Sequence, residues 1–232
     1  MNIPIDIHTH HLPAEAGTAI VNCLPQDFRP QPGGWYSVGI HPWTLAGEHM
    51  RDSVAIRTHD PMQQLATQSP SLDYDFLLRL LQHPQVLAVG EAGLDKLTAA
   101  PLSLQTEVFR RQAVLAEEVG KPLIIHLVKA VDELLKLKRE LHPSVPWIIH
   151  GFRGKAALAS ELLRHGFYLS FGEKYQAEAL RLPPTNRLLL ETDESRVPID
   201  TLYEQAALVR GISVEECRKS TEKTINMVFF RQ

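Results

Sequence analysis

Short apolar runs recur at regular intervals along the 232-residue chain and alternate with segments of helical spacing. Eight of these runs are rich in β-branched or other apolar residues and end at polar or turn residues, which is typical of buried strands. In chain order, the eight runs are IPIDIH, TAIVNCL, WYSVGIH, VLAVGE, PLIIH, VPWIIH, FYLSF and RLLLETD. The pattern therefore predicts eight strands.

Helices are predicted between several of these strands. The clearest one carries apolar residues on one face from Leu104 onward and ends before Gly120, a residue that commonly terminates helices. The last one begins after Ser213, with Glu216 three residues further on, which is the spacing of a capping box. Strand and helix thus alternate, which indicates parallel β-α units. The predicted helical ranges are 73–82, 104–119, 131–141, 155–165 and 214–230.

Two stretches depart from this alternation. Only HHLPAEAG joins the first two strands, so the first crossover is too short for a full helix. Residues 44–71 are polar and lack a strong period, so we expect loop with some helix on the outside. No linker, repeat or low-complexity tract divides the chain. We therefore expect residues 1–232 to form one domain, a compact (β/α)8 TIM-like barrel with a shortened first crossover.

Composition narrows the function classes only slightly. The formal net charge of −3 provides no overall attraction for nucleic acid, so contact with a polyanion would need a local patch or metal ions. The two cysteines, Cys23 and Cys217, fit neither a metal motif nor a disulfide framework and are expected to be buried free thiols. Without a secretory segment or a membrane-spanning apolar run, the sequence favours a cytoplasmic protein with no membrane partner.

Ionisable residues stand at the same end of one predicted strand after another. In a parallel barrel the carboxyl ends of all strands open onto one face, so these side chains should converge. A His-x-His pair in extended chain also places both imidazoles on one side. Imidazoles and carboxylates together suit zinc, manganese or iron, and a carboxylate can bridge two ions. The residues at these ends are His8, His10, His41, Glu91, His126, His150 and Asp193.

A single histidine near a strand end is more often a hydrogen-bonded core or turn residue than a metal ligand. That interpretation is kept for His49, His59, His83, His142 and His165, while His11 is left unassigned. It is weaker for the strand-end set, because chance would have to place each residue at the corresponding end of a separate strand. The sequence therefore predicts a metal site.

Several motifs occur in a fixed order. The chain carries DIHTH, VGIHP at residues 38–42 and GEAGLD at 90–95, then a helix with Gln105, Phe109 and Gln112. PLIIH, WIIHGF and LLLETD follow. In this order and spacing, the chain resembles the TatD-type metal-dependent deoxyribonucleases, a family of the amidohydrolase-like TIM-barrel superfamily. The likeness covers nearly the whole chain.

The resemblance implies two divalent ions (Zn, Mn, Mg or Fe) bridged by Glu91. His8, His10, Glu91 and Asp193 would hold one ion, while Glu91, His126 and His150 would hold the other. It further implies hydrolysis of a phosphodiester by water, with Asp193 as the catalytic residue that orients the water and accepts its proton. His41 would be a substrate-binding residue that donates to a phosphate and does not bind an ion.

The chain also departs from the family pattern. Where many members read I-H-x-R-D, this chain reads IHLVKA, with Val128 and Lys129 at the last two positions. Arg153 replaces a serine in HGFRG. Lys129 and Arg153 could bind substrate or could be solvated surface side chains. The expected substrate is DNA or a short oligonucleotide, cleaved in an exonuclease-like manner. A small ester, amide or phosphomonoester is the alternative, and a non-catalytic metal-binding interaction module is the third interpretation.

Overall fold

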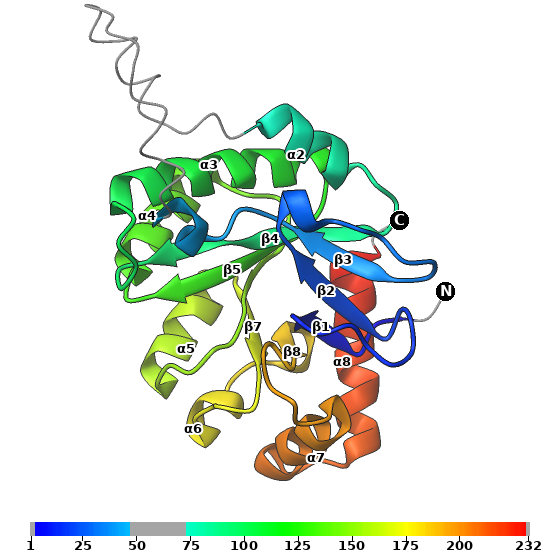
Figure 1. Ribbon diagram of the computed structural model, residues 1–232. Helices are drawn as coiled ribbons and strands as arrows, with labels where there is room; N and C mark the ends of the chain where they lie inside the picture. The colour runs from blue at the N-terminus through cyan, green and yellow to red at the C-terminus, as the bar shows by residue number, and fades with distance from the viewer. Residues whose placement is uncertain (1–2, 47–72, 231–232) are drawn as a thin grey trace, which may run out of the picture.

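The structure, a computed structural model, describes residues 3–46 and 73–230. Eight parallel strands form one sheet in sequential order (Figure 1). Each of them overlaps one of the eight predicted runs, although β1, β4 and β5 extend beyond the ends of theirs. The expected loop at 44–71 lies outside the described residues from residue 47 onward. The strands are β1 (Asp6–Thr9), β2 (Ala19–Cys23), β3 (Trp35–Val38), β4 (Val86–Asp95), β5 (Leu123–Val128), β6 (Trp147–Ile149), β7 (Tyr168–Phe171) and β8 (Leu188–Leu190).

The sheet closes into a barrel where the chain after β8 meets β1. Thr9 and Asp193 form a parallel bridge. The backbone N–H of Asp193 donates to the His8 carbonyl at 2.9 Å, and the N–H of His10 donates to the Asp193 carbonyl at 3.1 Å. The predicted TIM-like barrel is therefore confirmed.

Helices follow most of the later strands, and the five predicted ones are confirmed within two residues at each end. The connection between β1 and β2 holds no helix, so the shortened first crossover is confirmed as well. No described helix is long and apolar enough to cross a membrane. The helices are η1 (Pro25–Asp27), η2 (Pro42–Ala46), α2 (Tyr74–Leu81), α3 (Leu102–Val119), α4 (Val131–Leu141), α5 (Ala156–Arg164), α6 (Ala177–Leu180), η4 (Thr185–Arg187), α7 (Ile199–Arg210) and α8 (Val214–Phe229).

The sequence prediction missed α6 and α7. The first is a single short turn of helix, but α7 has recognisable ends, with Pro198 before it and Gly211 in the left-handed conformation after it. Its buried side chains include Ala206 and Ala207, which are small and give little contrast between the two faces. Terminal signals of proline and glycine could have identified α7 where apolar periodicity did not.

Two apolar layers hold the barrel together. The inner layer takes one or two side chains from each strand, including Trp35 and Tyr168 at the first positions of β3 and β7. Ile225, Val228 and Phe229 of α8 pack against the same layer. Helix α8 therefore closes the amino-terminal end of the barrel, and the opposite end stays open. The outer layer lies between the strands and the surrounding helices.

Both cysteines are free thiols, but only Cys217 is buried. The expectation of two buried thiols was wrong for Cys23, which is half-buried at the end of β2 and lines the main cavity. Burial on its other sides still raises the pKa of the Cys23 thiol to about 11.

Two buried glutamines of α3 fasten the loops at the open end of the barrel. Gln112 accepts from the backbone N–H of Ile40 at 2.7 Å and donates to the Ile40 carbonyl at 3.0 Å. Gln105 does the same for Asp95, at 2.7 and 3.0 Å. Because Ile40 precedes His41, the motif glutamines set the positions of residues at the open end.

Replacing Gln112 by leucine should lower the free energy of unfolding by about 2–4 kcal/mol, because both backbone groups of Ile40 would be buried without partners. Urea denaturation followed by circular dichroism measures this change. Val114→Ala, at an exposed position of the same helix, should stay within about 0.5 kcal/mol of the wild type. Equal stability of Gln112→Leu and the wild type would contradict the fastening role.

Candidate metal centre

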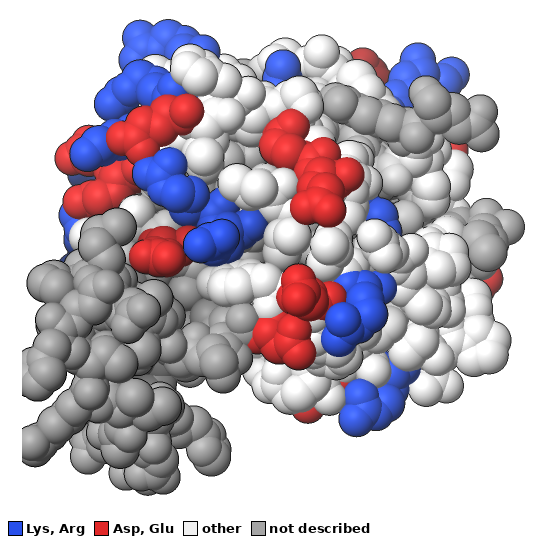
Figure 2. Space-filling model, turned by 90° about the horizontal axis from the view of Figure 1, so that it is seen from above, with Lys and Arg blue, Asp and Glu red and all other residues white. Residues whose placement is uncertain are grey.

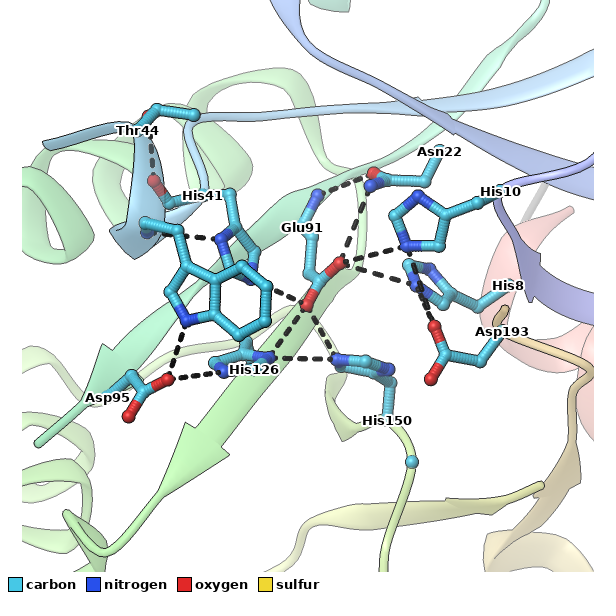
Figure 3. A network of polar contacts seen from close by, with 12 residues as sticks. His8, His10, Asn22, His41, Thr44, Glu91, Asp95, His126, His150 and Asp193 are labelled. Atoms are coloured by element: carbon cyan, nitrogen blue, oxygen red, sulfur yellow. Dashed lines mark hydrogen bonds and ion pairs between the residues drawn. The ribbon is translucent and has the colours of Figure 1, made fainter. Parts of the chain in front are cut away.

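The carboxylate of Glu91 lies at the centre of the residues that gather at the open end of the barrel (Figure 3). Glu91 belongs to the buried strand β4 and is 3% exposed. Side chains from β1, from β5 and from the loops after β1, β3, β6 and β8 surround it. All six residues of the predicted ligand set are brought together, and His41 joins them. The full group around Glu91 is His8, His10, His41, His126, His150 and Asp193.

One carboxylate oxygen of Glu91 faces the two histidines of β1 and its loop. The Nε2 atoms of His8 and His10 lie 3.4 and 3.6 Å from Glu91 Oε2. They also lie 3.8 and 3.5 Å from Oδ1 of Asp193. Two imidazoles and two carboxylate oxygens therefore converge on one small volume, and these four residues are the ones that the family resemblance assigned to the first ion.

The other oxygen of Glu91 faces the remaining histidines. Nδ1 of His126 lies 2.9 Å from Oε1, and Nε2 of His150 lies 2.7 Å from the same atom. Nε2 of His41 lies 3.1 Å away. The two oxygens of one carboxylate thus serve two different sets of nitrogens, which is the arrangement that a bridging ligand between two ions requires.

Acidic residues fix which nitrogen of His126 and His150 carries a proton. Nε2 of His126 lies 3.2 Å from Oδ2 of Asp95, and Nδ1 of His150 lies 3.2 Å from Oε1 of Glu191. An ionised carboxylate only accepts, so these nitrogens are the donors. In the neutral rings, the opposite nitrogens then turn a lone pair toward Glu91.

Lone pairs facing a carboxylate at these distances require positive charge between them. Protons on the imidazoles or divalent cations can supply that charge, and the same outer carboxylates accompany most metal-binding histidines. The donor set thus fits divalent metal ions. His8 also supports a metal site. It is fully buried, and neither of its ring nitrogens has a hydrogen-bond partner among the described residues, so a bound ion would satisfy a nitrogen that is otherwise unpaired.

The electrostatics of the cluster agree with this account. Burial alone would raise the pKa of Glu91, but the charge of His150 and hydrogen bonds from the surrounding histidines hold it well below its usual range. Burial alone would lower the pKa of His150, yet the charge of Glu91 and the bond to Glu191 raise it well above its usual range. The cluster therefore favours a carboxylate that keeps its negative charge.

The backbone at two positions is shaped for the site. Asp193 has a φ of 56°, a left-handed conformation that is uncommon outside glycine, and its hydrogen bonds to β1 hold it there. Gly93 lets β4 approach β5 closely, because a Cβ at Gly93 would lie 2.0 Å from the carbonyl oxygen of His126. Both features fix the distances between ligand-bearing strands.

A cavity of about 1140 Å³ opens above the cluster. The predicted substrate-binding residues His41, Lys129 and Arg153 all line it. Arg153 Nη2 lies 3.7 Å from Oδ2 of Asp193, while Lys129 is exposed and makes no ion pair within the described part of the chain. Trp43 also lines the cavity, and its indole N–H donates to Asp95 at 2.7 Å.

Sequence reasoning missed three residues that contact the cluster, namely Asn22, Asp95 and Glu191. The last two lie inside the motifs GEAGLD and LLLETD, so their acidic character next to ligand strands was an available signal. Asn22 carries no comparable signal, since a single asparagine in a strand is unremarkable. Its contact with Glu91 depends on the neighbouring positions of β2 and β4.

The family described as "TatD related DNase" matches residues 28–229, which is most of the chain. This chain belongs to the TatD family. The resemblance seen in the sequence motifs is therefore confirmed.

Individual relatives agree with this membership. The chain is 40% identical over 130 residues to the uncharacterized metal-dependent hydrolase YabD of Bacillus subtilis, covering 52% of this chain and 51% of YabD. It is 31% identical over 161 residues to the 3'-5' ssDNA/RNA exonuclease TatD of Enterobacter lignolyticus, covering 65% and 57%. The matched regions thus span little more than half of either relative. The crystal structure of YjjV, a TatD homologue from Escherichia coli, is 18% identical, with a TM-score of 0.75 over 99% of this chain and 98% of YjjV.

Adding Zn²⁺ or Mn²⁺ to chelator-treated protein should raise the free energy of unfolding by about 2.7 kcal/mol per site when the free ion is at 100 times its dissociation constant. Differential scanning calorimetry with and without the ion measures the effect. Glu91→Gln should lose most of it, because the bridge between the two nitrogen sets is removed, whereas Glu222→Gln, at an exposed position of α8, should retain it. An equal response of both variants would contradict the assignment.

Proposed function

We propose that this TatD-type hydrolase cleaves phosphodiester bonds at the ends of DNA or short oligonucleotides, in an exonuclease-like manner. The observation that carries the proposal is the shared carboxylate of Glu91, whose two oxygens face separate sets of nitrogens. A pair of adjacent ions is suited to in-line displacement at a phosphodiester.

In the proposed arrangement, His8, His10 and Asp193 hold one ion with Glu91, and His126 and His150 hold the second. His150 also lies within reach of His8 and Asp193, so it borders both positions. Such ions, when bound, neutralise charge on the phosphate oxygens and make a water more acidic. The proposed ions are divalent Zn, Mn, Mg or Fe.

Asp193 is the proposed proton acceptor. Its Oδ1 faces His8 and His10, whereas its Oδ2 faces Arg153 and the cavity. One oxygen can therefore serve the ligand set while the other orients the attacking water and accepts its proton. The hydrogen bonds that tie Asp193 to β1 hold both oxygens in place.

The substrate assignment rests on the cavity and on a relative. Lys129 and Arg153 flank the cluster and are the proposed contacts for substrate phosphates. Figure 2 shows acidic and basic side chains interspersed on one face of the molecule, without a broad basic field there. Because the formal net charge of −3 offers no overall attraction for a polyanion, the proposal assigns this affinity to the cavity. The name of the Enterobacter relative, a ssDNA/RNA exonuclease, supports a nucleic-acid substrate here.

A small phosphoester is the second candidate. Val128 lines the cavity where many family members carry an arginine, and Leu24, Val131 and Leu158 add further apolar lining. Such a wall would accept an apolar group of a small ester as readily as a nucleobase.

The two free thiols suit a reducing compartment, so a cytoplasmic location is part of the proposal.

Asp193→Asn should lower the rate of metal-supplemented cleavage of a labelled single-stranded oligonucleotide by at least about 100-fold, because the proton acceptor is lost. Gel analysis of product lengths over time measures the rate and shows whether shortening begins at an end. Asp200→Asn is the matched control, since Asp200 is exposed on α7 and pairs only with Arg218 among the described residues.

The substrate panel includes bis(p-nitrophenyl) phosphate and p-nitrophenyl phosphate. Turnover of these reporters without shortening of the oligonucleotide would replace the nuclease assignment by the small-substrate one. Inactivity on every member of the panel, despite bound metal, would remove both.

Arg153→Ala should raise KM for the oligonucleotide and reduce the slope of log KM against log salt concentration by about 0.7, the value for one lost contact with a single-stranded phosphate. Lys129→Ala should behave alike, and Lys223→Ala on α8, at the closed end of the barrel, should change neither quantity. Steady-state kinetics between low and moderate salt provides the measurement. An unchanged slope in both cavity variants would place these residues outside the substrate contact.

A further inference from the structure

Each oxygen of the Glu91 carboxylate lies next to an N–H group from a residue outside the proposed ligand set (Figure 3). Nδ2 of Asn22 lies 3.4 Å from Oε2, and Nε2 of His41 lies 3.1 Å from Oε1. Asn22 comes from β2 and His41 from the loop after β3, so the two groups approach Glu91 from neighbouring elements.

The orientation of the Asn22 amide is fixed by its other contacts. Its Oδ1 accepts from the backbone N–H of Glu91 at 2.8 Å and from the hydroxyl of Ser37 at 3.3 Å. A backbone N–H can only donate, so the atom facing it must be the amide oxygen. The NH₂ group is then left facing Oε2 of Glu91, to which it donates.

The tautomer of His41 is fixed by the same kind of argument. The backbone N–H of Trp43 donates to Nδ1 of His41 at 3.1 Å. The neutral ring therefore carries its proton on Nε2, the atom that faces Glu91 Oε1. This reverses the situation of His126 and His150, whose lone pairs face Glu91. His41 offers that oxygen a donor, and a nitrogen that carries a proton there cannot bind an ion.

A carboxylate oxygen has two lone pairs, so each oxygen of Glu91 can accept one N–H and still bind one ion. We propose that Asn22 and His41 are positioning residues that hold Glu91 as the bridge between two ions. The proposal rests on the proposed metal centre and assigns to His41 a contact with the bridging carboxylate, in place of the substrate phosphate expected from the sequence.

Such a pair of donors matters because a glutamate side chain is long and loses rotamer freedom when it is held in one orientation. With one donor on each oxygen, the plane of the carboxylate is set before an ion arrives. Partners of ligating groups typically change metal affinity by about 10–100-fold when they are substituted. The same range is expected for Asn22 and His41.

The test is to titrate chelator-treated protein with Mn²⁺ alone. Isothermal titration calorimetry measures the affinity, and metal analysis after dialysis measures the number of ions bound. His41→Leu should still bind two ions, with the affinity of at least one of them weakened by about 10–100-fold. His41→Gln, whose amide can place an N–H near the same position, should recover most of the loss. Asn22→Leu should show the same weakening, and His165→Leu, at an exposed position after α5, should match the wild type.

Two outcomes would overturn the proposal, and each is recognisable. Loss of one of the two ions in His41→Leu would make His41 a ligand. Unchanged metal affinity with a raised KM for the oligonucleotide would make it a phosphate contact. Failure of Asn22→Leu to fold leaves the two His41 variants to decide. Because the titration uses no substrate, a wild type that binds two ions but cleaves no oligonucleotide would refute the nuclease proposal and leave this one intact.

Discussion

A negatively charged carboxylate buried beneath a ring of imidazoles is the constraint on which the rest of this structure depends. Glu91 is almost inaccessible, and its burial is favourable only if each oxygen is paired with donors or cations. The side chains that face its two oxygens come from β1, β2, β5 and the loops after β1, β3 and β6. These strands must therefore end at the same level of the barrel. Closure of the barrel between β1 and the segment after β8 supplies that condition, because it brings Asp193 beside the β1 histidines.

The same constraint explains why outer polar residues matter as much as the inner ones. Asp95 and Glu191 determine which nitrogens of His126 and His150 face Glu91, and Gln105 in turn holds the backbone of Asp95. A buried polar network is stable only when every member is satisfied. The fold thus gives the proposed ligands fixed donor and acceptor sides, and metal binding would add directly to its stability.

The sequence was sufficient for the barrel and for the six proposed ligands, because both follow from local pattern. Alternation marks the strands, and ionisable residues at strand ends must meet once the strands are parallel. It was not sufficient for the orienting contacts. Whether His41 presents a proton or a lone pair depends on the N–H of Trp43, and the role of Asn22 depends on the register of β2 against β4. Such contacts arise only in the assembled fold.

Depth in the barrel also distinguishes the bridging carboxylate from the residues proposed to contact substrate. Glu91 and His126 stand on strands that are buried and hydrogen-bonded on both sides, so their geometry tolerates little change. The departures from the family pattern fall at Val128, the last residue of β5, and at Lys129 and Arg153 in the loops after β5 and β6, and all three line the cavity. Loops can vary without loss of the core, which is why new specificities arise there. An unchanged set of proposed ligands with an altered rim is therefore the form expected of a family member that retains the reaction while its substrate changes.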